Sequence, residues 1–447
     1  MKRKLGEKAI VIGGGLTGLV TARVLSDYFQ TVTVIERDPV TETGRFTPRT
    51  GVPQATQTHL LRTNGAAILM GLFPDIATAL KKNGAYEVDL LNEMNNYTLG
   101  WKPKLKSGKR TFLQSRPLLD ETIRSLMPQY PNIEILYDSE VIDLLINFRE
   151  NRMTGIRYVT NSPRKETNLY GDLIVDASGS KTHFPDWLER LNLERPPKEE
   201  VPVNVSYFTR FFRWPEGYEP DWKYMAVINS ERRRIGMILA VENDSLGKRW
   251  SVSIMGQFEG AKIETDAQFL AGALELGPPE FHDVIAQTTA LTPIESYMFP
   301  AIRRYKYEDL QKLPSHFLAI GDALCAWTPL SGVGMTASLS TIDILNQSFA
   351  KSNLNEAVSH YFRGAKKWSD NCWKIYSQKE YYEHSLGKLP FGMRFLRWYK
   401  NSILKLCNQD PKLWSKMYTV VNAENSPRIL YNPLLMLRVF WQALLER

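Results

Sequence analysis

A glycine-rich turn near the start of the chain constrains its fold more than any other feature. Residues 9–12 are apolar and predict a short buried strand, and Gly13, Gly15 and Gly18 follow it in the spacing G-x-G-x-x-G. The next residues predict a helix, and a second apolar stretch predicts a strand that ends at Glu36. A strand, a tight turn, a helix and a second strand in this order predict a βαβ unit of a parallel sheet.

Each glycine has a physical task in such a unit. Gly13 permits the tight turn, Gly15 lets a diphosphate approach the backbone, and Gly18 lets the helix pack closely on the strand. The helix N-terminus offers unpaired N–H groups and the positive end of its dipole to phosphates, and Glu36 can accept hydrogen bonds from ribose hydroxyls. The motif alone also occurs in ordinary turns, but here both strands and the acid stand where a dinucleotide site needs them. The residues expected to contact the dinucleotide are Gly13, Gly14, Gly15, Leu16, Thr17, Gly18, Glu36 and Arg37.

The pattern of apolar residues changes along the chain and divides it into regions. Residues 201–258 alternate as antiparallel strands do, a buried strand returns near residue 316, and the residues after 350 predict helices. With 447 residues, the chain is long enough for two or three domains. The expected fold is α/β (α+β overall), with a discontinuous Rossmann-like domain, an inserted antiparallel sheet and a helical C-terminal region. The expected boundaries are 1–84, 113–185 and 300–350 for the nucleotide-binding domain, 85–112 and 186–299 for the substrate-binding domain, and 351–447 for the helical region.

The composition narrows the range of partners and compartments. The net charge of +8 favours anionic partners such as NADPH, anionic lipid or acidic carrier proteins. The basic residues are scattered and their longest run is 232–234, so nucleic acid is not expected. Cys325, Cys372 and Cys407 are far apart, which excludes a dithiol centre and a cysteine-rich zinc site and suits the cytoplasm as the expected location. We expect no metal, no signal peptide and no membrane span, because no apolar run reaches about 18 residues.

Four later segments carry further motifs. They are 49–54 (Arg-Thr-Gly-Val-Pro-Gln), 116–119 (Arg-Pro-Leu-Leu), 176–181 (Asp-Ala-Ser-Gly-Ser-Lys) and 321–336, where Gly-Asp-Ala is followed by a proline and then by Gly-Val-Gly-Met-Thr. With the first glycine turn, these segments make residues 8–350 resemble the FAD-dependent monooxygenases that are built like p-hydroxybenzoate hydroxylase and squalene epoxidase. The resemblance lies in the short motifs and is weak between them.

The resemblance implies a role for single residues in these segments. It places Arg49 at the FAD diphosphate, Arg116 against the cofactor, and the backbone of Val141 beside adenine. A permanently charged guanidinium is well suited to a diphosphate. The resemblance also gives Asp322 a hydrogen bond from a ribityl hydroxyl and places Pro329 at the oxygen-reacting face of the flavin.

The second glycine turn is implied to hold the flavin ring. Gly332, Val333, Gly334 and Met335 open the helix expected at 334–350, so their N–H groups would face the O2 region of the ring. The positive end of that helix would stabilise negative charge on reduced flavin.

Residues 53–61 resemble a subgroup that includes bacterial polyketide epoxidases, through Pro-Gln and a later His-Leu-Leu. In that comparison His59 faces the flavin or the substrate, which makes His59 and Pro329 the candidate catalytic residues; a helix-capping or packing histidine is the open alternative. The segment 176–181 departs from the fuller Asp-Gly-x-x-Ser-x-x-Arg pattern of relatives that use NADPH efficiently. The electron donor therefore stays open between NAD(P)H itself and a separate flavin reductase.

The chemistry implied by the resemblance is oxygen transfer. O2 would be activated as a flavin C4a-hydroperoxide, and an apolar substrate of the natural-product type would be epoxidised or hydroxylated. The inserted sheet is rich in aromatic and methionine side chains and shows no Asp, Glu or His cluster, so epoxidation, which needs no protein base, is slightly favoured. The expected substrate contacts are Tyr207, Phe211 and Met237.

Three other functions stay open. A C=C reductase of the geranylgeranyl type would share the FAD site without using O2. A flavin halogenase would carry Trp-x-Trp-x-Ile-Pro, which Trp214 and Trp222 do not form, and a lysine on a strand. A non-enzymatic flavin-binding protein is the third. The aromatic and basic tail at 388–447 either packs over the substrate pocket or rests on a membrane surface.

Overall fold

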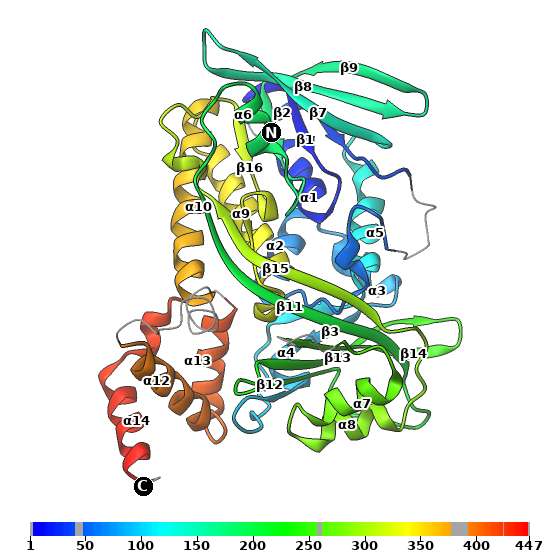
Figure 1. Cartoon of the computed structure of the whole chain (residues 1–447), viewed down its shortest axis with the longest axis vertical. Coiled ribbons are helices and arrows are strands. Elements are labelled where there is room, and N and C mark those ends of the chain that lie inside the picture. Colours follow the sequence, from blue (N-terminus) through cyan, green and yellow to red (C-terminus); the bar gives the residue numbers. More distant parts are fainter. Residues whose placement is uncertain (1–2, 41–47, 257–261, 377–391, 423, 446–447) are drawn as a thin grey trace.

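The computed structural model describes residues 3–40, 48–256, 262–376, 392–422 and 424–445. A parallel sheet with its helices forms the upper half of the molecule in Figure 1, and an antiparallel sheet forms the lower half. The last helices lie at the lower left. This arrangement confirms the α/β fold class with a separate antiparallel sheet.

The parallel sheet has the strand order β16-β10-β1-β2-β6. Its strands are β1 (Gly6–Ile12), β2 (Phe29–Ile35), β6 (Ile133–Leu136), β10 (Leu173–Asp176) and β16 (Phe317–Ala319). Their apolar residues are mostly buried, as expected for parallel strands that are covered on both faces. Helix α1 (Leu16–Leu25) connects β1 to β2 and packs against α9 (Gly334–Phe349). Ile12 pairs with Ile35, so the glycine turn and Glu36 come together at the carboxyl end of the sheet.

Further helices and a small antiparallel sheet complete the upper half. The strand order of this small sheet is β7-β8-β9, and β8 packs against β10 of the parallel sheet. The remaining elements of this half are η1 (Pro53–Thr56), α2 (Thr63–Leu72), α3 (Ile76–Lys82), α5 (Arg116–Leu126), η2 (Met127–Gln129), β7 (Ser139–Asn147), β8 (Arg152–Asn161), β9 (Arg164–Tyr170), α6 (Phe184–Arg190), η3 (Tyr307–Asp309), η4 (Gly321–Ala323) and η5 (Pro329–Ser331).

The large sheet of the lower half has the order β17-β15-β11-β14-β13-β12-β4. All its neighbouring pairs are antiparallel except β12 and β4, which run parallel. Its outer face buries an apolar core around Trp250 together with α7 and α8. The elements here are β4 (Met94–Tyr97), β11 (Lys198–Arg213), β12 (Tyr224–Asn229), β13 (Arg234–Asp244), β14 (Gly247–Gly256), β15 (Glu295–Tyr305), β17 (Cys325–Ala326), α7 (Asp266–Leu274) and α8 (Pro279–Ala286), with β3 (Tyr86–Asp89), α4 (Leu90–Glu93) and β5 (Arg110–Leu113) beside them.

Two strands tie the halves together. β15 runs across residue 300, where the sequence places a domain boundary, and β17 pairs with it through Arg303 and Arg304. The sheet of the lower half therefore takes strands from both sides of that boundary. Figure 1 shows β11 and β15 sweeping from the upper half into the lower one.

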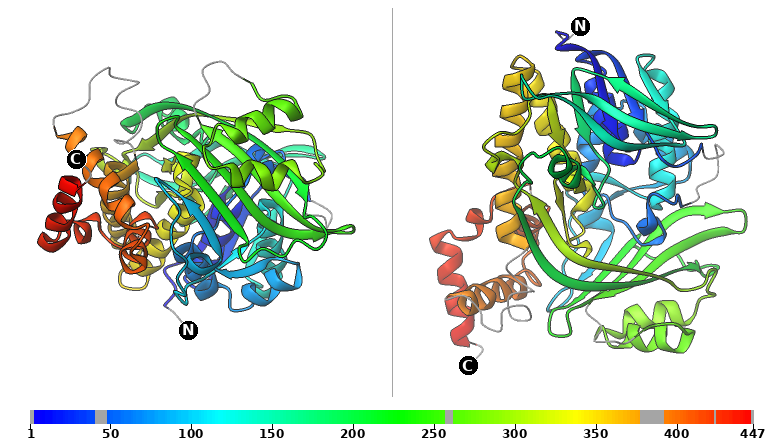
Figure 2. Two further views of the ribbon diagram at one scale, coloured as in Figure 1. Left: turned by 90° about the horizontal axis from the view of Figure 1, so that it is seen from below. Right: turned by 45° about the horizontal axis from the view of Figure 1, so that its top comes forward.

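The helices that follow α9 pack on two different parts of the molecule. α10 (Leu354–Tyr376) packs against α9 and belongs to the core of the upper half. The later elements share a core with the large sheet; they are α12 (Met393–Leu406), α13 (Pro411–Val421), η6 (Pro427–Leu430) and α14 (Pro433–Leu445). Trp414 and Tyr418 of α13 share an apolar core with Tyr224 and Leu239 of the sheet. Both views of Figure 2 keep α14 on the outside of the molecule. Among the residues that the structure describes, none of the helices combines the length and apolar character needed to cross a bilayer.

Candidate functional site

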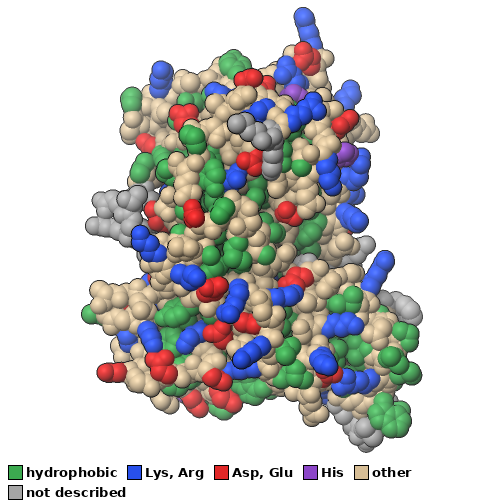
Figure 3. Space-filling model, turned by 180° about the vertical axis from the view of Figure 1, so that it is seen from behind, with side chains coloured by type: hydrophobic (Ala, Val, Ile, Leu, Met, Phe, Trp, Pro, Cys, Tyr) green, Lys and Arg blue, Asp and Glu red, His purple; other side chains and the backbone are tan. Residues whose placement is uncertain are grey.

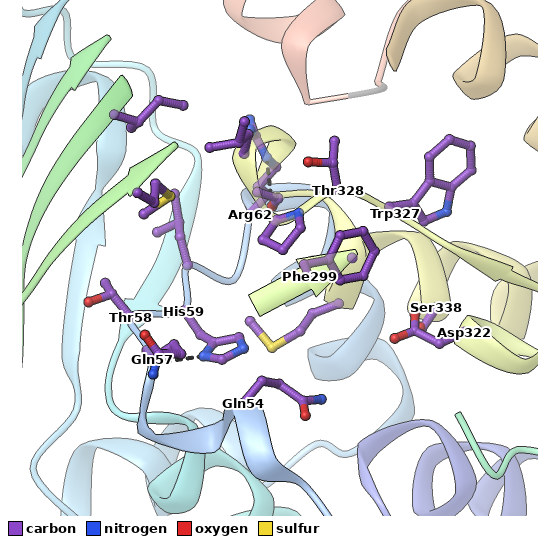
Figure 4. Close-up of a pocket in the computed structure, with 18 of the residues that line it drawn as sticks. Gln54, Gln57, Thr58, His59, Arg62, Phe299, Asp322, Trp327, Thr328 and Ser338 are labelled. Atoms are coloured by element: carbon purple, nitrogen blue, oxygen red, sulfur yellow. Dashed lines mark hydrogen bonds between the residues drawn. The ribbon is translucent and has the colours of Figure 1, made fainter. Parts of the chain in front are cut away.

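A large cavity of about 1000 Å³ lies between the two halves and the C-terminal helices. This volume is at the upper end of the range of roughly 300 to 1,000 Å³ that is usual for ligand pockets. Residues from the carboxyl end of the parallel sheet, the large sheet, and α12 and α13 all line it. Figure 4 shows part of this space, with His59 and Gln54 on one side of the view and Asp322 on the other.

The first glycine turn forms one end of the cavity. Gly13 has φ +100°, and a Cβ on Gly18 would lie 1.8 Å from the carbonyl oxygen of Gly13, so helix α1 can approach the strand only with glycine here. The N-cap residue of α1, Gly15, has no capping side chain, and the first turn of the helix contains no acidic residue. Its N-terminal N–H groups therefore present positive charge to the cavity, as an anion site requires.

Glu36 and Arg49 form a buried ion pair beside this turn. One oxygen of Glu36 accepts a hydrogen bond from the Gly14 N–H at 2.8 Å, and the Arg49 guanidinium lies 3.1 Å from the same carboxylate and 3.4 Å from Asp38. Burial opposes the charge of Arg49, but Glu36, Asp120 and Asp38 outweigh it and raise the arginine pKa. The buried Nε of Arg49 has no hydrogen-bond partner within the described chain. This unused donor next to the uncapped helix fits a bound diphosphate.

Asp322 and Arg116 occupy the middle of the cavity wall. Arg116 follows the N-cap residue Ser115 of α5 and makes an ion pair with Asp120 at 2.8 Å. Burial raises the pKa of Asp322 to about 6, although Arg116 and Arg303 act in the opposite direction. The Asp322 side chain is half-buried, and no donor to its carboxylate stands among the described residues, so a ligand hydroxyl would supply a hydrogen bond there.

The second glycine turn forms a further helix end at the cavity. Gly332 adopts φ +60° after η5, and α9 begins at Gly334 without a capping side chain or an acidic first turn. A Cβ on Gly334 would meet no atom within 4 Å. The buried hydroxyl of Thr336 has no partner within the described residues. The positive end of this helix thus faces open space, where it would stabilise a negatively charged ring.

The structure brings most of the residues expected to hold a cofactor to one cavity. Gly18 and Val333 do not line it, because Gly18 lies under the first turn and Val333 is buried in the core. Those that line the cavity are Gly13, Gly14, Gly15, Leu16, Thr17, Glu36, Arg37, Arg49, Arg116, Val141, Asp322, Gly332, Gly334 and Met335, and Pro329 lines it as well.

His59 also lines the cavity, in the loop between η1 and α2, and it caps neither helix. Its Nδ1 lies 2.8 Å from the carbonyl oxygen of Gln57, as the dashed line in Figure 4 shows. A carbonyl can only accept, so Nδ1 carries the proton and Nε2 is left as an acceptor. Burial, and then the charge of Arg116, lower the pKa of His59 to about 4. The ring is therefore neutral near pH 7.

The expected substrate contacts are only partly brought to the cavity. Tyr207 and Met237 line it, whereas Phe211 does not, and its ring lies under the Arg249 guanidinium at 5.0 Å. Phe211 stands on the same face of β11 as Tyr207, but Thr209 lies between them. A buried polar cluster closes the cavity at that point: Thr209 donates to the Gln57 side chain at 2.6 Å and also lies within hydrogen-bond distance of Ser253.

The C-terminal helices supply cavity residues that the sequence analysis did not name singly, although packing of the tail over the pocket was one of its two alternatives. Tyr399, Trp414, Met417 and Tyr418 line it, and so do Tyr297 and Phe299 on the same face of β15. The alternation of Tyr297 and Phe299 is a signal that sequence analysis could have used. No local pattern indicates where the C-terminal helices dock, because that depends on their packing against the distant sheet.

Arg62 is a further residue that the sequence did not single out. Its Nε donates to the carbonyl oxygen of Gly332 at 3.0 Å, and Nη1 donates to the Asn422 side chain at 2.7 Å. Asn422 in turn donates to Thr63 at 3.2 Å. Arg62 therefore connects the second glycine turn to the end of α13. The helical tail is held against the cavity by polar contacts as well as by its apolar core.

Comparisons with known proteins agree with this geometry at the level of the fold. No protein-family model matches the chain. Over 341 residues, it is 29% identical to protein Rv3254 of Mycobacterium tuberculosis, covering 74% of this chain and 70% of that protein. The flavin-dependent brominase Bmp2 superposes with a TM-score of 0.64 and 14% identity over 94% of this chain and 93% of its own. The p-nitrophenol 4-monooxygenase PnpA of Pseudomonas putida DLL-E4 gives a TM-score of 0.60 and 14% identity over 94% and 99%. The chain has the fold that these flavin-dependent halogenases and monooxygenases share.

Proposed function

We propose that the protein is an FAD-dependent monooxygenase that uses O2 to epoxidise or hydroxylate an apolar organic substrate. One observation carries this proposal. The N-termini of α1 and α9, both without a capping side chain, lie on one cavity, and the same cavity includes a chamber with apolar walls. The adenine dinucleotide end would lie at Glu36 and Arg49, and the ring end at the second glycine turn. The fold shared with flavin enzymes supports the same assignment.

The residues present fit the cofactor chemically. The Nε of Arg49, which has no partner among the described residues, suits the diphosphate, and the half-buried carboxylate of Asp322 suits a ribityl hydroxyl. The N-terminus of α9 suits the part of the ring that becomes negative on reduction. When bound, FAD supplies the activation of O2 that amino-acid side chains cannot provide.

The chain itself would bind, orient and shield the substrate. Tyr207, Met237 and Phe299 on the large sheet, together with Trp414 and Met417 of the tail, offer apolar and aromatic contacts. A wall of this kind excludes water from the reacting centre. It selects a substrate by shape and apolar area rather than by charge.

The proposed reaction also needs a source of electrons. We place NAD(P)H as the ultimate electron donor, acting directly on the bound flavin or through a flavin reductase. Either route is compatible with a single dinucleotide site in the described chain.

The contacts of the cavity favour oxygenation over halogenation. A halogenase of this fold would carry a lysine on a strand. The lysines among the described cavity-lining residues are Lys181, in the loop after β10, and Lys400, on α12. Neither lies on a strand.

Oxygen consumption tests the proposed function. The purified protein, supplied with a flavin reductase and NADH, should be yellow and should consume O2 when an apolar alkene or a phenol is added. Its product should contain one oxygen atom from ¹⁸O2. Turnover under nitrogen that saturates a C=C bond, or a protein that retains no flavin, would overturn the assignment.

His59 separates the two oxygenation reactions. We expect His59→Gln to lower kcat for a phenol by about 10²- to 10⁴-fold, because Nε2 is the neutral acceptor in the cavity and such a base typically contributes that factor. Epoxidation of an alkene by the same variant should change much less. The acid limb for phenol turnover should be centred near pH 4, since the folded pKa is about 4.

A matched control is His282→Gln, on α8 beside Asp283 and outside the cavity lining. It should leave both reactions and the flavin content unchanged. Equal losses for the phenol and the alkene in His59→Gln would rule out His59 as the base.

A further inference from the structure

Helix α14 is apolar on two opposite faces. Leu435 and Val439 are buried in the core that joins the tail to the large sheet. On the outer face, Leu434 is 79% exposed and Trp441 is 66% exposed. A helix that is apolar all round is normally buried on all sides. Among the described residues, nothing therefore packs over the apolar outer face of α14.

This exposed face continues onto α12 and η6 and reaches the cavity. We define the C-terminal patch as Phe395, Leu396, Tyr431, Leu434, Leu437, Phe440, Trp441 and Leu444, all of them exposed. The Phe440 ring lies 6.4 Å from the Phe395 ring, which stacks on the cavity residue Tyr399 at 6.2 Å. Leu396 and Tyr431 line the cavity and are also exposed. The patch therefore borders one opening of the cavity, which we call the cavity mouth.

The tail around the patch is strongly basic. Within residues 392–445 there are eight Lys and Arg against two acidic residues, a net charge of +6 out of +8 for the whole chain. Arg394 and Arg397 of α12 and Arg428 of η6 are exposed, near the patch residues Phe395 and Leu396 of α12 and Tyr431 just after η6. Figure 3, at the lower right, shows hydrophobic and basic side chains gathered over this region.

We propose that the C-terminal patch docks on the surface of an anionic lipid bilayer, with the cavity mouth facing the lipid. An exposed apolar face with basic residues beside it is the arrangement that binds such a surface, because apolar side chains enter the headgroup region and cations meet the lipid charge. A second copy of the chain fits this face less well, because the two tails, each with a net charge of +6, would repel each other. The proposal also gives an apolar substrate dissolved in the bilayer a direct route between α12 and η6. This route rests on the function proposed above, whereas the docking does not.

Vesicle sedimentation tests the docking. The full-length protein should co-sediment with phosphatidylcholine vesicles that contain phosphatidylglycerol, and much less with phosphatidylcholine alone. Binding should fall steeply between low and high salt. The double variant Leu434→Asp/Trp441→Asp should reduce the bound fraction at least tenfold. The matched control is Leu246→Asp, because Leu246 is 81% exposed but lies in the turn between β13 and β14. It should bind vesicles like the wild type.

Labelled cysteines test the orientation. The native cysteines are all buried, so an environment-sensitive fluorophore should react with an introduced one. The emission at Leu396→Cys and Trp441→Cys should shift to the blue with anionic vesicles, and the emission at Leu246→Cys should not. A shift at position 441 without one at 396 would overturn the placement of the cavity mouth at the lipid.

The remaining outcomes distinguish the two proposals. Wild type that stays in the supernatant at low salt would overturn the docking, whatever the flavin content. A dimer seen by sedimentation velocity without vesicles, and lost in Leu434→Asp/Trp441→Asp, would identify a second copy as the occupant. Flavin content and reduction in that variant should equal those of the wild type. A colourless protein that still binds vesicles would instead overturn only the enzymatic proposal.

Discussion

Replacement of Gly18 by alanine is expected to abolish flavin retention and to destabilise the protein by about 3 kcal/mol, at the upper end of the usual cost of overpacking. The added Cβ would lie 1.8 Å from the carbonyl oxygen of Gly13, which is backbone and cannot move aside. Helix α1 would have to leave the strand, and its N-terminal N–H groups would leave the diphosphate position. Urea unfolding and the ratio of flavin to protein absorbance measure the two effects.

Gly71→Ala is the matched control for this substitution. Gly71 lies in α2, and a Cβ there would meet no atom within 4 Å. Because alanine is the better helix former, this variant should gain about 0.5 to 1 kcal/mol and keep its flavin. A yellow Gly18→Ala protein with wild-type stability would show that α1 does not carry the cofactor.

Replacement of Asp322 by alanine is expected to weaken flavin binding without weakening the fold. A hydrogen bond to a charged group contributes about 1.5 to 3 kcal/mol, so the Kd for FAD should rise by roughly 10- to 100-fold. Titration of the apoprotein with FAD, followed by flavin fluorescence, measures this change. Asp322→Asn, which keeps an acceptor oxygen, should lose less affinity than Asp322→Ala.

Asp322 should also make the stability of the flavin-free protein depend on pH. Burial raises the pKa of Asp322 from 3.8 to about 6, so the folded state binds this proton more tightly than the unfolded state. The stabilisation of the folded state by this proton is complete below pH 4 and is lost as the pH rises through 6. Flavin-free Asp322→Asn should therefore be more stable than flavin-free wild type at pH 7.5, by about 3 kcal/mol, and the difference should become small near pH 4. A variant that is less stable at pH 7.5 would contradict a raised pKa of Asp322 in the folded protein.

Local sequence was enough to group the residues around the first glycine turn, for a physical reason. The geometry around Gly13 and Gly18 is dictated by backbone closeness that few other residues allow, so short motifs suffice to predict it. The register of β1 and β2 then determines where Glu36 must stand. Arg49 and Asp322 were placed by resemblance, and the structure brings both to the same cavity.

The residues at the apolar end of the cavity were harder to predict, because its lining depends on packing between distant segments. Phe211 has the right residue type on the right face of its strand, yet the hydroxyl cluster around Thr209 closes the cavity before reaching it. Tyr418 and Arg62 are nearly 360 positions apart in the sequence and meet only when the tail folds back on the sheet. Periodicity within a segment does not contain that information.

The pairing of β17 with β15 has a mechanical consequence. Cys325 begins β17 three residues after Asp322 and bonds to the strand that carries Phe299 on its chamber side. A bulky guest that pushes this strand outward would pull on Asp322, the carboxylate that we propose accepts from the ribityl hydroxyl of FAD. Binding of a guest in the chamber should consequently shift the absorption maximum of the oxidised flavin. The shift should be measurable before any reductant is added.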